Sequence, residues 1–213
     1  GKFQVKNKTT FTFGNSNDVP FNSFSDYSHL NPYLRIYDED GNYLRKLESF
    51  SGYAGTLVNP LYEIHNYNSY DKTKYYEIVD NLLVNWNITK DLRLRLQMSA
   101  TIKRENSELY KDPASASYGT GNLAMNGDKS VSSGDSNVID GTLQLMYNKS
   151  IKKHYMNLNL SSNLRSSQYT TEYADYRGFP GGDLTSSNYA AEIVNKPTRN
   201  DQRSRLLGFL LTG

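Results

Sequence analysis

The chain has 213 residues, of which 37% are hydrophobic, and its 24 basic and 22 acidic residues give a formal net charge of +2. A charge so close to balance gives no reason to expect nucleic acid as a partner. The sequence contains no cysteine, which excludes disulfides and thiolate chemistry. It also contains no run of about eighteen apolar residues of the kind that forms a transmembrane helix.

The first strand is predicted near 2–13, because Phe3, Val5, Phe11 and Phe13 share one face of an alternating segment. Residues 14–74 are then rich in Asn, Ser, Asp, Gly and Tyr and are predicted as a long outer loop. Within that loop, Asp40-Gly41 is typical of the turn of a small hairpin over 33–47.

The clearest pattern lies in the middle of the chain. From Leu92 to Ile102 every even position is apolar and every odd position is polar. This period of two predicts a strand at 92–103 with one apolar and one polar face. A similar strand is predicted at 75–88, although Val79, Asp80 and Leu83 interrupt its alternation. The short polar turn between them predicts an antiparallel hairpin.

The same design recurs in the second half of the chain. Strands are predicted at 138–147 and 154–165 with a short basic turn between them, and a last strand is predicted at 202–212. Residues 104–137 and 166–201 are predicted as two more outer loops. The fold class is therefore all-β, with about six antiparallel strands whose connections are alternately long and short.

Strand length and loop asymmetry favour part of a large transmembrane β-barrel. A strand that crosses a bilayer needs about 9–11 residues, more than is usual in a soluble domain. Outer-membrane barrels have short turns on one side and long loops on the other. The alternative is a soluble all-β, lectin-like carbohydrate-binding module. Because six strands are too few for a closed barrel and the pattern runs to both chain ends, we expect a piece of a longer protein.

Candidate binding residues come from tyrosine-rich loops and from the polar strand faces. Ten of the 18 tyrosines fall between Tyr27 and Tyr76, and rings such as Tyr53 and Tyr62 offer stacking surfaces for a ligand. Arg93 and Arg95 are expected to face a wet lumen, where they contact an anionic substrate or pair with acids. Four other tyrosines are expected to pack loops or to form an aromatic girdle at the membrane edge; these are Tyr75, Tyr76, Tyr147 and Tyr155.

No metal site, cofactor or enzymatic activity is expected. Asp38, Asp40 and Asn42 have the alternate spacing of a calcium loop, but the Glu required at the end of that loop is displaced, so a hairpin turn is favoured. The three histidines lie far apart without metal-ligand spacing. The sequence also lacks the Gly-x-Ser-x-Gly elbow of a hydrolase and the Lys-Ser/Thr ending of a phosphate loop.

A series of short motifs runs along nearly the whole chain: Asn31-Pro32-Tyr33, Tyr37 to Tyr43, Asn59-Pro60-Leu61, Trp86-Asn87-Ile88, Leu92 to Arg95, His154 to Leu158, and Gly178 to Leu184. In order and spacing they resemble the SusC/RagA family of TonB-dependent outer-membrane transporters. The resemblance implies a barrel of about 22 strands that imports oligosaccharides or peptides in Bacteroidetes. It also implies an outer-membrane location with lipid around the wall, a SusD-like surface lipoprotein as partner, and TonB acting through a plug domain that this sequence lacks.

Overall fold

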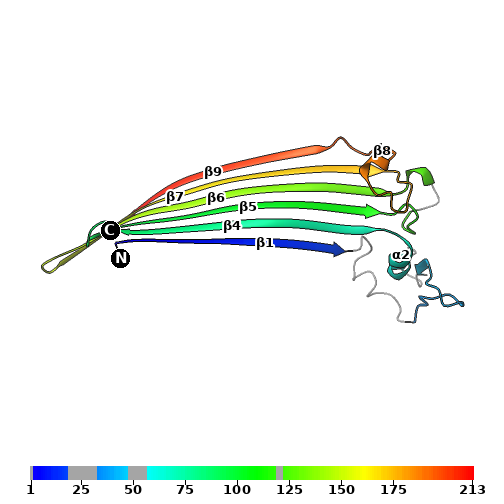
Figure 1. The fold of residues 1–213 in the computed structure, drawn as a ribbon, viewed down its shortest axis with the longest axis horizontal. Coiled ribbons are helices and arrows are strands. Elements are labelled where there is room, and N and C mark those ends of the chain that lie inside the picture. Colours follow the sequence, from blue (N-terminus) through cyan, green and yellow to red (C-terminus); the bar gives the residue numbers. More distant parts are fainter. Residues whose placement is uncertain (1, 19–32, 48–56, 119–121) are drawn as a thin grey trace.

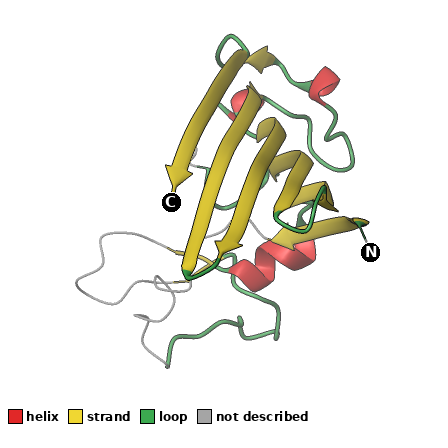
Figure 2. Cartoon of the chain, turned by 90° about the vertical axis from the view of Figure 1, so that its left-hand side faces the viewer, coloured by secondary structure: helices red, strands yellow, loops and turns green. Residues whose placement is uncertain are grey.

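The computed structural model describes residues 2–18, 33–47, 57–118 and 122–213. Six long strands form one antiparallel sheet in the order β1, β4, β5, β6, β7, β9, so the all-β prediction is confirmed (Figure 1). The strands are β1 (Phe3–Asp18), β4 (Tyr70–Asn87), β5 (Leu92–Lys111), β6 (Asp128–Ile151), β7 (His154–Arg177) and β9 (Thr198–Thr212). The sheet curves across its strands, as Figure 2 shows.

The strands are longer than the sequence pattern predicted. β5 continues to Lys111, and β6 already begins at Asp128, so much of the predicted loop 104–137 is strand. Similarly, β7 runs to Arg177 and β9 starts at Thr198, which shortens the predicted loop 166–201. The alternation disappears there because both faces of these extensions carry polar side chains, while the backbone ladder continues without interruption.

Both predicted short turns are present, and they lie at the same end of the sheet (Figure 1). Residues 88–91 join β4 to β5, and Lys152 and Lys153 join β6 to β7, with Lys152 in the left-handed region at a φ of 57°. The β6–β7 hairpin projects beyond the β4–β5 turn, since its pairing with β5 ends at Tyr147. We call this end of the sheet the turn end and the opposite end the loop end.

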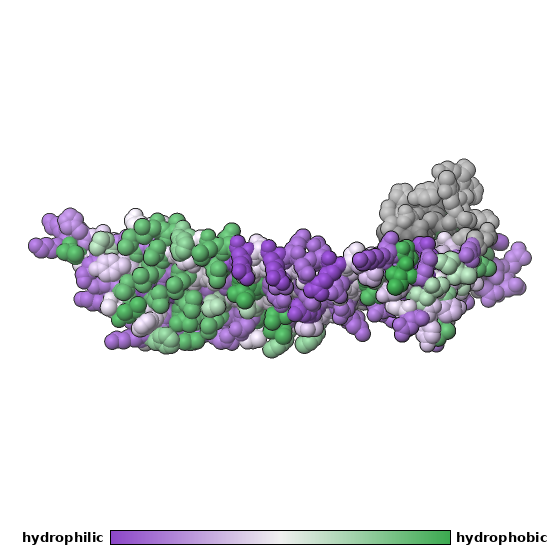
Figure 3. All heavy atoms as spheres, turned by 90° about the horizontal axis from the view of Figure 1, so that it is seen from above, coloured by the Kyte–Doolittle hydropathy of each residue, from purple (hydrophilic) through white to green (hydrophobic). Residues whose placement is uncertain are grey.

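The register divides the strands into two faces. The apolar face carries a band of large side chains over the part of the sheet nearer the turns, and Figure 3 shows them as a continuous green surface. This apolar band consists of Phe3, Val5, Phe11, Phe13; Tyr76, Ile78, Leu82, Val84, Trp86; Leu92, Leu94, Leu96, Met98, Ala100, Ile102; Ile139, Leu143, Leu145, Tyr147; Met156, Leu158, Leu160, Leu164; Leu207, Phe209 and Leu211. The opposite, polar face carries mainly hydrophilic side chains.

Asp80 does not break strand β4, although it interrupts the apolar band. The pairing of β4 with β1 and β5 is continuous through this position. The Asp80 carboxylate accepts hydrogen bonds from Asn7 Nδ2 at 3.0 Å and from Thr9 Oγ1 at 2.6 Å, both on β1. The strand therefore keeps its register because neighbouring side chains satisfy the carboxylate.

The four tyrosines predicted to pack loops or to form an aromatic girdle divide between the two faces of the sheet. Tyr76 and Tyr147 lie on the apolar face at opposite margins of the band. Tyr75 and Tyr155 lie on the polar face, because each occupies the other parity of its strand. The Tyr75 ring instead lies over Gly14, so closely that a Cβ added to Gly14 would be 2.0 Å from it.

Short elements and turns form a layer at the loop end. They are β2 (Lys46–Leu47), β3 (Leu57–Val58), α2 (Pro60–Asn66), β8 (Glu192–Ile193) and the 3-10 helices Leu123–Met125 and Ser187–Tyr189. Helix α2 was not predicted. Its signal was present, because Asn59 caps the helix by accepting a hydrogen bond from the Leu61 N–H at 3.1 Å and Pro60 begins it.

The buried apolar residues that the structure describes belong to this layer or adjoin it: Leu47, Val58, Tyr110, Ala116 and Phe179. The Tyr110 and Phe179 rings meet edge to face with their centroids 5.3 Å apart. Gly178 takes a φ of +78°, and a Cβ added there would lie 2.6 Å from the Cβ of Ala191. Glycine at this position therefore lets the chain after β7 fold back onto the layer.

The small hairpin predicted over 33–47 is present. Tyr37 and Tyr43 form an antiparallel bridge, and Gly41 supplies the positive φ, +82°, at the turn. Asp38 Oδ1 accepts hydrogen bonds from the backbone N–H groups of Asp40 at 3.0 Å and Asn42 at 2.8 Å. These three residues thus form the turn that was favoured over a calcium loop.

Candidate functional site on the polar face of the sheet

The polar face presents two regions of different charge. Toward the turn end, within the six strands, its charged residues are basic apart from Asp140; they are Lys6, Lys8, Arg93, Arg95 and Arg165. Toward the loop end acids predominate, namely Asp18, Asp71, Glu77, Glu105, Asp128 and Asp175, beside Lys103, Lys111 and Arg177. A solute moving along this face would pass from an acidic to a basic surface.

Arg93 and Arg95 lie where the sequence predicted, on the polar face and exposed to solvent. Arg93 Nε donates a hydrogen bond to Asn87 Oδ1 at 2.9 Å. Arg95 helps to line a hollow of about 200 Å3, together with Lys6, Lys8 and Gln97. Within the described part of the chain, neither arginine has a carboxylate within ion-pair distance. This region offers guanidinium and ammonium groups to an anionic group.

Tyr62 lies far from these arginines. It belongs to α2, at the loop end of the sheet, whereas Arg93 begins β5 beside a turn (Figure 1). Its ring packs edge to face against Tyr67, with centroids 5.8 Å apart. Burial and hydrogen bonding with Tyr62 raise the pKa of Tyr67. The fourth predicted residue, Tyr53, lies outside the described residues.

The structure therefore does not assemble the predicted residues into one site. Tyr62 belongs to the loop layer, where its neighbour Tyr67 lines a hollow of about 450 Å3 with the ends of β1 and β4. Arg93 and Arg95 belong to the strand wall.

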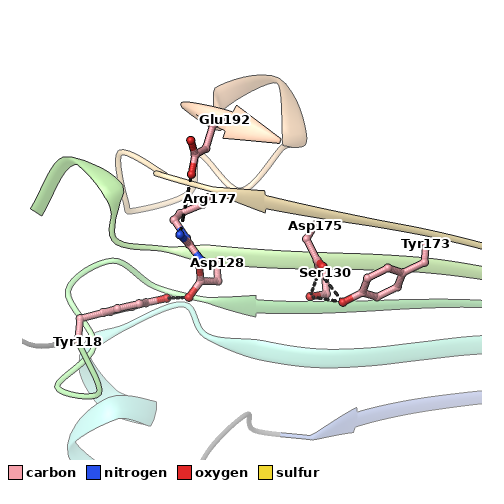
Figure 4. Close-up of polar contacts among 7 residues, drawn as sticks. All are labelled: Tyr118, Asp128, Ser130, Tyr173, Asp175, Arg177 and Glu192. Carbon is pink, nitrogen blue, oxygen red and sulfur yellow. Dashed lines mark hydrogen bonds and ion pairs between the residues drawn. The ribbon is translucent and has the colours of Figure 1, made fainter. Parts of the chain in front are cut away.

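A polar cluster that sequence reasoning missed lies at the loop end of the same face (Figure 4). Asp175 Oδ1 accepts hydrogen bonds from Ser130 Oγ at 2.6 Å and from the Tyr173 hydroxyl at 2.5 Å. The hydrogen bond to Asp175 raises the pKa of Tyr173. The phenol therefore remains a neutral donor across the physiological pH range.

The second half of this cluster links the end of β7 to the loop layer (Figure 4). Asp128 accepts hydrogen bonds from the Tyr118 hydroxyl at 2.8 Å and from Arg177 Nε at 3.2 Å. Arg177 Nη1 also lies 3.9 Å from Glu192. Burial, reinforced by the hydrogen bond to Asp128, raises the pKa of Tyr118. These contacts hold strands β6 and β7 and the chain around β8 in one arrangement.

The cluster was missed because its members lie on strand extensions that the hydrophobic pattern does not reveal. The predicted register could not have found it. Ser130 and Asp175, like Asp128 and Arg177, are equidistant from the observed turn at Lys152 and Lys153, whereas the turn was predicted over 148–153, which sets a different register.

In chemical terms the polar face can bind and guide a polar solute. It offers carboxylates and phenols at one end and cationic groups at the other. In the described part of the chain, no group of three or more His, Cys, Asp or Glu side chains is placed to hold a metal ion. In the same residues, no helix is long and apolar enough to cross a membrane.

Comparison with solved structures finds chains of similar fold. The chain matches the RagAB peptide importer in its "closed-closed" state with a TM-score of 0.74 at 14% identity, and in its "open-open" state with a TM-score of 0.73 at 13% identity. A third structure, of the RagAB peptide transporter, gives a TM-score of 0.73 at 14% identity. At this identity the match shows a shared fold.

The match covers nearly all of this chain but only part of the others. It includes 97% of this chain in each case, and 24%, 23% and 24% of the three matched chains. The chain therefore spans about a quarter of the length of the solved proteins it resembles. No protein-family profile matches the sequence, and no curated protein matches it either.

Proposed function

We propose that this chain is a segment of the wall of a SusC/RagA-like, TonB-dependent transporter of the outer membrane. The apolar face contacts lipid, and the polar face lines the path of the imported solute. The observation that carries the proposal is the size and slope of the apolar band. The fold shared with RagAB importer chains supports it.

The height of the band fits a membrane. On β4 it extends from Tyr76 to Trp86, which at about 3.3 Å per residue is roughly 33 Å along the strand. A strand tilted by about 40° would then cover roughly 25 Å along the membrane normal, the height of the apolar band of outer-membrane barrels. A soluble sandwich has no need for a band of this height.

The slope of the band fits a tilted barrel strand. Following the register from Tyr76 leads to Asp201 on β9, but the apolar residues on the outward face of β9 begin only at Leu207. The margin thus moves by six residues, roughly 20 Å, over four strand spacings of roughly 4.8 Å. That slope corresponds to a tilt of about 45°, close to the tilt of strands in membrane barrels.

The side chains of the band are exposed in the chain itself. Even on strands paired on both sides, Ile139 is 46% exposed, Leu160 47% and Leu164 49%. A continuous apolar surface of this extent needs an apolar surrounding. Lipid supplies it without a second sheet, and it leaves the opposite face free to contact water.

The remaining parts of the proposal concern partners and cargo. The strands continue beyond the band and end in the loop layer, which would stand outside the membrane and meet a SusD-like lipoprotein. TonB would act on a plug that belongs to the same protein as this wall. The cargo would be a peptide or an oligosaccharide; the RagAB structures are named for a peptide importer.

Site-directed spin labelling of the full-length protein that contains this chain tests the proposal. Because this chain has no cysteine, Leu94→Cys and Leu96→Cys place labels on the apolar face, and Arg93→Cys and Arg95→Cys place matched labels on the polar face. In liposomes, the first pair should be relaxed by oxygen and the second pair by a water-soluble nickel complex. Water contact at 94 and 96 would reject the wall and favour the soluble, lectin-like module.

A further inference from the structure

We propose that a basic rim on the outward, apolar side of the sheet binds the phosphate groups of anionic lipids in the loop-side leaflet of the membrane. The inference rests on the proposed function, since it needs the apolar band to lie in lipid. The rim consists of Lys72, Lys74, Arg104, Arg203 and Arg205.

The position of these residues relative to the band is the first argument. On each of the six long strands, we considered the first two outward-facing residues beyond the loop-side margin of the band. Together these positions hold the five basic residues of the rim and a single acid, Asp135. Headgroups of a bilayer begin at the margin of the apolar band, so these cations lie at headgroup height.

The second argument is that the cations are largely without carboxylate partners. Arg104 Nε pairs with Asp135 at 3.0 Å. Within the described residues, the other four rim residues form no ion pair with a carboxylate. By contrast, Arg199, farther along β9, is held by Glu172 at 2.8 Å and by Asp201 at 3.0 Å.

Arg203 and Arg205 form the best-placed pair. Both are exposed, and their register partners on β7 are the uncharged Gln168 and Ser166. Leu207 follows on the same face and belongs to the band, so an acyl chain lying on Leu207 would bring its phosphate to these guanidinium groups. Arginine binds phosphate oxygens through two parallel hydrogen bonds, which makes this pair suited to a phosphate headgroup.

The turn end lacks this arrangement. There the outward-facing Lys149 pairs with Asp91 at 2.5 Å. Lys90, Lys152 and Lys153 lie in the two turns, beyond the ends of the strands. Among the outward-facing positions of the strands themselves, the lysines and arginines without a carboxylate partner in the described residues therefore lie on the loop side of the band. A lipid with a phosphate group in the loop-side leaflet matches that asymmetry, whereas a zwitterionic lipid gains little from it.

Lipid binding by the purified full-length protein provides the test. After delipidation in detergent, the protein is titrated with phosphatidic acid or with phosphatidylcholine of the same acyl chains, and bound lipid is counted by native mass spectrometry. We expect preferential binding of phosphatidic acid, weakened about tenfold by R203Q/R205Q. The matched control K152Q/K153Q removes the same charge at the turn end and should change binding less than about twofold.

Several outcomes would overturn the inference. Equal binding of the two lipids, or equal loss in both double variants, would show that the rim does not select a phosphate headgroup. Displacement of phosphatidic acid by an equal concentration of inorganic phosphate would identify a site for free anions instead.

Spin labels at position 94, measured in R203Q/R205Q, separate this inference from the proposed function. If the labels contact lipid but phosphatidic acid binding is unchanged, only the rim inference fails. If they contact water, the wall assignment fails as well.

Discussion

The two ends of the sheet differ in how their apolar side chains are covered. At the loop end, Tyr110 and Phe179 are buried, at 0% and 4% exposure, against a layer of short elements and turns. Toward the turn end, Leu143 and Leu160, on strands paired on both sides, are still 44% and 47% exposed. The same ladder of strands thus builds its own small core at one end and leaves its apolar residues to the surroundings at the other. The comparison teaches that one end covers its apolar side chains within the chain, whereas the other leaves them to be covered from outside it.

The largest expected effect comes from placing a charge on one face of β5 at two heights. Leu96→Arg puts a cation in the apolar band and should cost about 2–4 kcal/mol, enough to prevent insertion of the full-length protein. Asn106→Arg, on the same face beyond the band, should cost less than about 1 kcal/mol. Recovery of heat-modifiable protein in the membrane fraction measures both. If both variants reduced recovery equally, the band and the region beyond it would not differ in their tolerance of charge.

A smaller effect is expected from the core of the loop end. Tyr110→Ala removes the ring that meets Phe179 and should destabilise the loop layer by about 3–4 kcal/mol. Hydrogen exchange of residues 112–118 and 178–191 should accelerate, while exchange in the strands near the turns stays unchanged.

Tyr110→Phe is the matched control. The Tyr110 hydroxyl is buried without a hydrogen-bond partner within the described residues, and burial raises the pKa of Tyr110 to about 12. Loss of this hydroxyl should therefore be neutral or slightly stabilising. If Tyr110→Phe were as harmful as Tyr110→Ala, the ring contact would not be what holds the layer.

The smallest expected effect is a local response to acid. Backbone hydrogen bonds, the largest from Asn42, hold the pKa of Asp38 below its usual value of 3.8. A carboxyl with a lowered folded-state pKa stabilises its turn above the unfolded pKa and loses that contribution as pH falls through the folded value. Below about pH 3.8, NMR signals of residues 36–44 should therefore broaden or shift toward random-coil positions.

Asp38→Asn separates titration from turn geometry. Asparagine keeps the side-chain oxygen that accepts from the backbone N–H groups, so this hairpin should form without the acid response. A persistent acid transition in Asp38→Asn would assign the titration to another group. In either variant the band near the turns should show no response over this range.

How far the sequence predicts the structure follows the same division. The strand at Leu92 to Ile102 and its hairpin partner are predictable, because a sheet with one polar and one apolar face requires polar and apolar side chains to alternate. Residues 104–111 are not, since Glu105, Ser107 and Arg104 leave no contrast between the faces. Asp80 interrupts the sequence pattern but not the strand. The sequence pattern could not show this, because the hydrogen bonds to its carboxylate come from β1 residues more than seventy positions away.

The candidate site divides similarly. Arg93 and Arg95 could be placed on the polar face from parity alone. The grouping of Ser130, Tyr173 and Asp175 depends on a register carried through two strands of 24 residues each. The alternation of residues along a strand also gives no information on Tyr62. This residue lies in helix α2, at the opposite end of the sheet from these arginines. The alternation of polar and apolar residues therefore predicts on which face of the sheet a residue lies. Only the strand register shows which residues are its neighbours.

The projecting tip of the β6–β7 hairpin has a further consequence. Beyond Asn148 on β6, whose N–H donates a hydrogen bond to the Asp91 carbonyl oxygen at 2.8 Å, the outer edge of this strand has no ladder partner within the described residues. Open edges of this kind invite pairing with foreign chains. Here Lys152 and Lys153 follow that edge directly in the turn, and their adjacent positive charges oppose the approach of a second tip.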